Sequence, residues 1–257
     1  MSGFKTFEFN LSQALLEQVV TALDGLEAEL LTSDAIAKIP EAQGVYKLFL
    51  DRTLVYIGKT DAEAGLHQRL ERHWRRIQHR NGLEDARVTF KALQVYVFAA
   101  MDLETQLISA YRSRGQDPAW NGSGFGNNDP GRNRETTNQA PDGFDANYPL
   151  NIDRAEIALE PGTYRVAAVL SRVRATLPYT LRYETERGAS GRANPYRPHP
   201  DLQGTNITMP ASIGPLTTRR LLQLILAALP KGWQATSFPS HVILYKEDQE
   251  YLHGTRI

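Results

Sequence analysis

The chain of 257 residues contains no cysteine, and this absence excludes several kinds of chemistry. Disulfides, zinc–thiolate sites, iron–sulfur clusters and cysteine nucleophiles all need a thiol. Long apolar runs are missing too, because Leu221–Leu229 is interrupted by Gln223 and is far too short to cross a bilayer. Residues Met1–Asn10 lack the basic stretch and apolar core of a secretion signal. We therefore expect a soluble cytoplasmic protein without membrane contact.

The chain has no excess of charge of either sign, because it contains 29 basic and 29 acidic side chains. These charges are unevenly distributed along the sequence. Residues 1–64 carry five basic and ten acidic side chains, residues 65–134 carry eleven and seven, and residues 135–257 carry thirteen and twelve. A partner feels the local potential more than the total charge. The zero net charge therefore does not exclude a nucleic acid.

Hydrophobic periodicity predicts the elements of the first half of the chain. The runs Gly44–Leu50 and Thr53–Gly58 are rich in β-branched and aromatic residues, and Asp51 and Arg52 between them favour a tight hairpin. Asp102 suits a helix N-cap or first turn. We expect helices over Leu11–Leu26, Leu66–Gln78 and Asp102–Arg114, a short helix from Ser33, and a third strand over Arg87–Phe98.

The composition changes after residue 117, where a stretch rich in Asn, Gly and Pro indicates loops. Beyond it we expect strands over Arg154–Leu159, Gly162–Leu170, Tyr179–Glu186 and His241–Lys246, a loop over Gly188–Pro200, and a helix over Thr217–Leu229. The sequence thus predicts an α+β protein with a first domain over 1–135, a linker over 136–148, and a β-rich α+β accessory domain over 149–257.

Two glycine-containing triplets lie on the predicted hairpin. Gly58-Lys59-Thr60 is not a phosphate-binding loop, because that motif needs a glycine where Thr53 stands. The triplets Gly44-Val45-Tyr46 and Tyr56-Ile57-Gly58 are instead followed by an Arg, a helical Glu and a Trp-Asn pair, in that order. In this order the sequence resembles the GIY-YIG nuclease family, with Val in place of Ile in the first triplet.

The resemblance becomes narrower around two further features. The Arg69-x-x-x-His73 pair and the run Trp120–Arg134 resemble the branch of the family that contains type II restriction endonucleases. The resemblance covers Ala42–Arg134, and residues 148–257 match no family pattern. It implies a bacterial enzyme with a small, mainly antiparallel three-stranded sheet flanked by helices.

The resemblance also implies a set of catalytic residues: Tyr46, Tyr56, Arg69, His73, Glu104 and Asn121. Glu104 offers the hard oxygen ligand that Mg²⁺ or Mn²⁺ prefers, and these ions keep water and substrate oxygens as further ligands. Arg69 suits a scissile phosphate, where negative charge develops. Tyr46 is a candidate base or water-orienting group, with Lys59 and His73 as candidate helpers, because a phenol is a poor base at neutral pH.

Each of these residues also has an ordinary structural interpretation. Buried strand tyrosines, a surface arginine, a glutamate at a helix start and an asparagine in a turn are all common. Their joint order favours a site, whereas none would indicate one alone. His73 shares its predicted helix with His67 and His79, so a catalytic and a structural role both stay open for it.

The expected partner is double-stranded DNA, and a palindromic target would favour a homodimer in which each copy cuts one strand. The accessory domain serves either DNA recognition or dimerisation. A nuclease for modified or structured DNA or for RNA, or a nucleic-acid-binding module without catalysis, stays the alternative. The candidate DNA contacts are Lys59, Arg72, Arg75, Arg76, Asn127, Asn128, Arg132 and Arg134.

Overall fold

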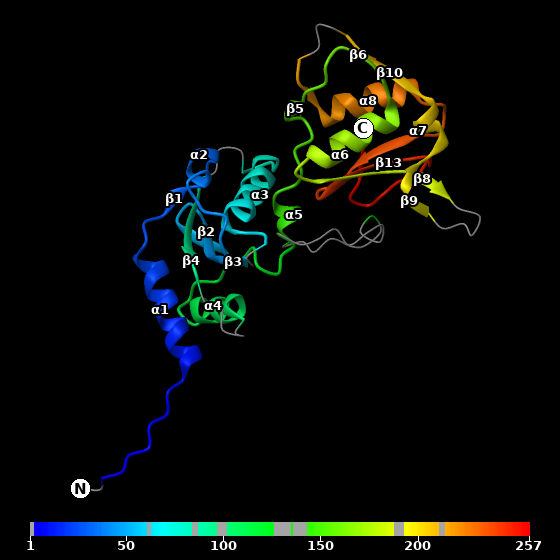
Figure 1. Cartoon of the computed structure of the whole chain (residues 1–257). Coiled ribbons are helices and arrows are strands. Elements are labelled where there is room, and N and C mark those ends of the chain that lie inside the picture. Colours follow the sequence, from blue (N-terminus) through cyan, green and yellow to red (C-terminus); the bar gives the residue numbers. More distant parts are fainter. Residues whose placement is uncertain are drawn as a thin grey trace. The chain divides into compact units, whose positions relative to one another are not determined.

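The structure is a computed structural model that describes residues 3–60, 63–83, 87–96, 102–125, 135, 143–187, 193–210 and 214–257. It confirms the α+β class and forms two compact units (Figure 1). Unit 1 consists of Met1–Arg75 and Asp85–Phe125, and unit 2 of Arg76–Glu84 and Gly126–Ile257. The domain limits expected from the sequence stay a prediction. In the part of the chain described, no helix is long and apolar enough to span a membrane.

Unit 1 is built on one antiparallel sheet with the strand order β1-β4-β2-β3. Its strands are β1 (Glu29–Leu30), β2 (Gly44–Leu50), β3 (Thr53–Thr60) and β4 (Val88–Gln94). The expectation of three strands was wrong, because β1 adds a fourth at the outer edge of β4. A strand of two residues shows no alternation of polar and apolar side chains, so its sequence carries no signal.

The hairpin between β2 and β3 contains a β-bulge as well as a tight turn. Asp51 and Arg52 both have positive φ, 47° and 70°, as a two-residue type I′ connection requires. Phe49 pairs with Leu54, but Leu48 pairs with Tyr56, so Val55 has no opposite residue in β2. Shifting the register by one residue moves every later side chain to the other face. The bulge therefore decides which face Tyr56 occupies.

Helices cover both faces of this sheet (Figure 1). Helix α1 (Leu11–Gly25) begins at Asn10, whose side-chain oxygen accepts the Gln13 N–H, and it packs with α4 (Leu103–Arg112) on one face. Helix α3 (Leu66–Gln78) has the predicted bounds and lies on the other face, and the short α2 (Ser33–Ile36) precedes β2. The α1–α4 side holds an apolar core of Val19, Val20, Leu23, Val45, Leu54, Ile57, Val95, Leu103, Leu107 and Tyr111.

Unit 2 contains a four-stranded sheet of order β14-β12-β13-β7, in which β13 and β7 run parallel, and three two-stranded pairs, β10–β6, β11–β5 and β8–β9. Side chains of α6 and α8, among them Leu170 and Ile225, share its core with Leu181 and Val242 of the sheet. The elements are α5 (Phe144–Asn147), β5 (Ala155–Ile157), β6 (Gly162–Arg165), α6 (Val166–Thr176), β7 (Thr180–Tyr183), β8 (Thr185–Arg187), β9 (Ala193–Pro198), α7 (Pro200–Gly204), β10 (Asn206–Met209), β11 (Leu216–Thr217), α8 (Thr218–Ala228), β12 (Gln234–Ser237), β13 (His241–Tyr245) and β14 (Thr255–Arg256).

Two expectations for unit 2 were wrong. The predicted strand Gly162–Leu170 ends at Arg165, and the helix α6 begins at Val166. The apolar run that opens α6 is short, and such a run does not distinguish a strand from a buried helix. The expected loop Gly188–Pro200 contains the strand β9, which pairs with β8.

Candidate active site

The glycines of both triplets are required by close packing. Gly58 lies directly opposite Tyr46 in the β2–β3 pair, and a Cβ added to Gly58 would lie 2.5 Å from Cζ of the Tyr46 ring. A Cβ added to Gly44 would lie 2.6 Å from Cδ1 of Leu66 on α3. A glycine at each position therefore lets the phenol and the helix approach the sheet closely.

Tyr46 and Tyr56 lie on the α3 face of the sheet. Because Tyr46 and Leu48 alternate along β2, they share one face, and the bulge places Tyr56 opposite Leu48 on that same face. The two phenol rings are 6.1 Å apart between centroids. Without the extra residue, Tyr56 would pair with Lys47 and point to the α1–α4 side.

Tyr46 meets two side chains of α3. Its hydroxyl lies 2.7 Å from Nε2 of His73 and accepts a longer hydrogen bond, 3.4 Å, from Nε of Arg69. Arg69 and His73 are four residues apart, so both project from one side of the helix. Tyr46 and His73 are almost fully buried, at 0% and 2% exposure, whereas Arg69 is half-buried. The cluster thus has a buried hydrogen-bonded pair beside a cation that solvent can reach.

Phe125 completes the aromatic surroundings of His73, and sequence reasoning did not single it out. Its ring stacks on His73 with 4.7 Å between centroids and contacts Tyr56 edge-on at 5.0 Å. The ring of Trp120 packs against that of Phe125, with 4.8 Å between centroids. The signal was present, because an aromatic residue in a Gly- and Asn-rich stretch needs a packing partner, but the sequence does not say which one.

Electrostatics keep both phenols neutral. Burial raises the pKa of Tyr46 well above its usual value, with a further contribution from Tyr56, while the charge and hydrogen bond of Arg69 lower it. Burial is also the largest cause of the raised pKa of Tyr56, and the negative charge of Glu104 is the second. Arg69 again opposes the rise. A phenol in these surroundings holds its proton at neutral pH unless a partner takes it.

Glu104 lies in the first turn of α4 and is half-buried. Burial raises the pKa of its carboxyl, while the nearby backbone N–H of Lys59 and the charges of Lys59 and Arg69 oppose the rise. The ammonium of Lys59 pairs with Asp102 at 3.0 Å and is not among the contacts of Tyr46. Of the two candidate helpers, the structure brings His73 to the phenol.

Asn121 binds the outer edge of β3. Its side-chain oxygen accepts the Ile57 N–H at 2.8 Å, and its amide nitrogen donates to the Ile57 carbonyl at 2.8 Å. The Trp120 N–H donates to the Val55 carbonyl at 2.7 Å, two residues earlier along the same edge. These groups bind the outward-facing backbone of Val55 and Ile57 in β3. Asn121 thus holds the strand that carries Tyr56.

The remaining predicted residues are placed less centrally. Arg72 is exposed on α3 and Arg75 is half-buried, and the half-buried Arg76 belongs to unit 2. Arg80, from the same basic stretch, is buried in unit 2 and pairs with Asp145 at 2.9 Å, so it serves the fold. The predicted DNA contacts Asn127, Asn128, Arg132 and Arg134 lie outside the described residues.

A divalent cation fits the donors present at Glu104. Among the residues that the structure describes, no group of three or more His, Asp and Glu side chains is arranged to hold a metal ion. A single half-buried carboxylate is nevertheless a suitable anchor for Mg²⁺, which retains water and binds phosphate oxygens. Glu104 would hold such an ion together with water and substrate.

Comparison of the chain with protein-family models finds no match, and comparison with curated proteins finds no match either. Assignment of a function therefore depends on the motif residues and on the geometry of the cluster.

Proposed function

We propose that the chain is a metal-dependent, site-specific DNA endonuclease of the restriction or phage-defence type, with a GIY-YIG nuclease domain. The observation that carries this proposal is the arrangement around Tyr46. Its hydroxyl contacts His73 at 2.7 Å and Arg69 at 3.4 Å, and the Glu104 carboxylate acts electrostatically on both phenols. An acid–base pair, a phosphate-binding cation and a metal-binding carboxylate are the groups that phosphodiester hydrolysis needs.

Tyr46 and His73 supply the route for the proton of the attacking water. In the neutral tautomer with its proton on Nδ1, His73 accepts the phenolic proton at Nε2. As the water oxygen attacks phosphorus, its proton passes to the Tyr46 oxygen and the phenolic proton passes to His73. This relay accounts for a buried phenol of raised pKa at the site, because the phenol does not have to ionise in advance.

Arg69 and Tyr56 would bind the scissile phosphate. The guanidinium of Arg69 is half-buried, and it hydrogen-bonds both phenols, so its orientation is fixed before substrate arrives. A positioned cation stabilises the charge that develops on the phosphate oxygens during attack. The Tyr56 hydroxyl stays protonated and donates a hydrogen bond to the same group.

Glu104 would hold the divalent cation. When bound, Mg²⁺ or Mn²⁺ supplies positive charge to the phosphate and to the leaving oxygen. The raised pKa of Glu104 implies that protonation competes with metal binding at a higher pH than for an ordinary glutamate. We therefore expect the acid limb of the cleavage profile to move to lower pH when the metal concentration is raised.

Recognition of a particular DNA sequence would require residues outside the catalytic cluster. Arg72, Arg75 and Arg76 on α3, with the run that contains Arg132 and Arg134, would contact the phosphate backbone and base edges. Unit 2 would serve DNA recognition or dimerisation, and its exposed Arg172 and Arg174 on α6 are suited to phosphates. A homodimer would place two cutting sites on a palindromic target.

The test is digestion of plasmid and phage DNA with and without Mg²⁺ or Mn²⁺, followed by sequencing of the ends. Glu104→Gln should reduce cleavage at least about 100-fold and preserve DNA binding, because it removes the metal-binding charge but not a phosphate contact. Glu71→Gln is the matched control, since Glu71 is exposed on α3 and the same charge is removed. Ends at one motif support a site-specific enzyme.

Other outcomes separate the alternatives. Cleavage at full rate by Glu104→Gln would reject the assignment of the metal-binding residue. Tight DNA binding without cleavage of any substrate would favour a binding module on the same scaffold. Cleavage restricted to modified DNA, branched DNA or RNA would keep the chemistry and change the target.

A further inference from the structure

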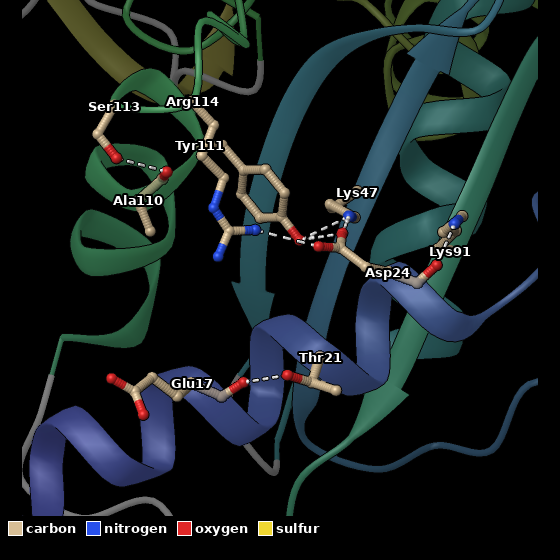
Figure 2. A network of polar contacts seen from close by, with 9 residues as sticks. All are labelled: Glu17, Thr21, Asp24, Lys47, Lys91, Ala110, Tyr111, Ser113 and Arg114. Atoms are coloured by element: carbon tan, nitrogen blue, oxygen red, sulfur yellow. Dashed lines mark hydrogen bonds and ion pairs between the residues drawn. The ribbon is translucent and has the colours of Figure 1, made fainter.

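A polar network lies between α1, α4 and the sheet (Figure 2). Since Lys47 alternates with Tyr46 along β2, this is the face of the sheet opposite Tyr46. Nζ of Lys47 donates to Oδ1 of Asp24 at 2.8 Å and to the Tyr111 hydroxyl at 2.7 Å. The Tyr111 hydroxyl donates to the same Asp24 oxygen at 2.6 Å, which closes a triangle of three hydrogen bonds. Arg114 adds a fourth contact, 3.1 Å to the other Asp24 oxygen. The triangle joins α1, β2 and α4.

Two of the three residues in this triangle, Lys47 and Tyr111, are buried. Lys47 is only 2% exposed and Tyr111 only 1%, so neither polar atom has ready access to water if its partner moves. Burial lowers the pKa of Lys47, and the hydrogen bond and charge of Asp24 oppose this change. Burial alone would raise the pKa of Asp24, but hydrogen bonds from Lys47 and Tyr111 lower it below 3.8. The Asp24 side chain is 45% exposed, so it is the buried Lys47 ammonium that tolerates little displacement from its partners.

The triangle grips the two elements that carry the candidate catalytic groups. Lys47 directly follows Tyr46 in β2, and neighbouring side chains of a strand point to opposite faces. Tyr111 follows Glu104 on α4 by seven residues, which is about two helical turns, so both lie along one stripe of the helix. A slide or rotation of α4 that moves the Tyr111 hydroxyl must also move the Glu104 carboxylate.

We propose that Lys47, Asp24 and Tyr111 are positioning residues that set α4 against β2 and thereby hold Glu104 and Tyr46 at their working separation. The inference rests on the proposed nuclease function. Apolar contacts between α4 and the sheet resist separation but allow small slides, whereas three short hydrogen bonds, two of them accepted by the same Asp24 oxygen, select a single arrangement. Helix α1 matters because it supplies Asp24, the acceptor of both other members.

The first test compares cleavage by Tyr111→Phe and Lys47→Met with that of a matched control, Lys91→Met. Lys91 lies directly opposite Lys47 on β4 and shares its face, but it donates to the backbone carbonyl of Asp24 at 3.2 Å and is half-buried. Single-turnover rates and DNA affinity are measured below the unfolding transition of each variant. Tyr111→Phe and Lys47→Met should lower the rate about 10- to 100-fold with unchanged affinity, and Lys91→Met should match the wild type.

Wild-type rates in both variants would overturn the proposal, and so would losses of rate and affinity in equal proportion, which indicate a general loss of structure. Tyr111→Phe removes one oxygen atom and carries the test if Lys47→Met does not fold. A wild-type chain that cuts no nucleic acid would contradict the proposed nuclease function, and the positioning role is then decided by a readout that needs no cleavage.

That readout is the ¹⁵N chemical shift of His73 Nε2, assigned by its loss in His73→Gln. This shift depends on the tautomer of His73 and on the hydrogen bond to Tyr46, so Tyr111→Phe and Lys47→Met should change it if they displace β2, and Lys91→Met should not. An unchanged Nε2 shift in both network variants would overturn the proposal whether or not the protein cuts DNA.

Discussion

The two faces of the unit 1 sheet use polar groups in opposite ways, although they meet within one strand. On the α3 face, Tyr46 and His73 form a buried hydrogen-bonded pair next to Arg69, which solvent can reach. On the other face, Lys47 and Asp24 neutralise each other within a closed set of hydrogen bonds. In the proposed function, the first face would offer its donors to an incoming phosphate, whereas the polar groups of the second face bind one another. Adjacent residues of a strand can thus serve chemistry and architecture.

The largest expected effect comes from removing one oxygen atom on the α3 face. Tyr46→Phe should reduce cleavage about 100- to 10,000-fold, because it interrupts the proton route between water and His73. The matching change on the other face, Tyr111→Phe, should cost about 1–3 kcal/mol of stability, since it removes one of the two hydrogen-bond partners of the buried Lys47 ammonium. Cleavage assays and chemical denaturation of both variants test the comparison. If Tyr46→Phe and Tyr111→Phe lost the same amount of activity and the same amount of stability, the contrast between the two faces would be rejected.

An intermediate effect is expected at the glycine beneath the phenol. Gly58→Ala places a methyl group where the Tyr46 ring lies, so the ring must move away from His73. We expect a loss of cleavage of about 10- to 100-fold, because a displacement of this kind misaligns the reacting groups. Val55→Ala, at the bulge, is the control, since it keeps the register and removes only a buried side chain. A Gly58→Ala variant with full activity would show that the close approach is not needed.

The smallest expected effect is on the α1–α4 face, where Asp24 should make the stability of the folded protein depend on pH. The pKa of Asp24 is lower in the folded chain than its usual 3.8, so the folded state gains stability from the ionised carboxylate above that pH. This gain is lost as the pH falls through the lowered pKa. Asp24→Asn should therefore be less stable than the wild type near neutral pH, with the difference shrinking as the pH falls below 3.8. Thermal melts at both pH values measure it, and a constant difference would contradict it.

Sequence patterns predicted the regular parts of unit 1 well and its irregular parts poorly. The bounds of α3 were predicted residue for residue, because its apolar and basic side chains follow a helical period. The bulge at Val55 was not predicted, since it depends on how two strands pair and not on either strand alone. In unit 2, the apolar start of α6 was taken for a strand because a short apolar run suits both structures.

The candidate site was predictable only as far as its motif residues extend. The order of Tyr46, Arg69 and His73 indicated that they act together, and the structure brings them within hydrogen-bonding distance. Lys47 gave no such signal, because a lysine in an alternating strand is usually exposed, and its burial follows from the packing of α1 and α4. Phe125 was missed for a similar reason, since ring stacking is a property of tertiary packing.

The outer edge of β3 lies next to the candidate site and also affects the tendency of the protein to aggregate. Backbone groups of this edge are occupied by the Asn121 side chain and by the Trp120 N–H. An unoccupied strand edge is a template on which another chain can add a strand, and this is a common start of aggregation. One of these two residues, Asn121, belongs to the candidate site. Substitutions of Asn121 chosen to abolish cleavage will therefore also expose an unpaired strand edge, and the yield of monomeric protein will fall for reasons unrelated to catalysis.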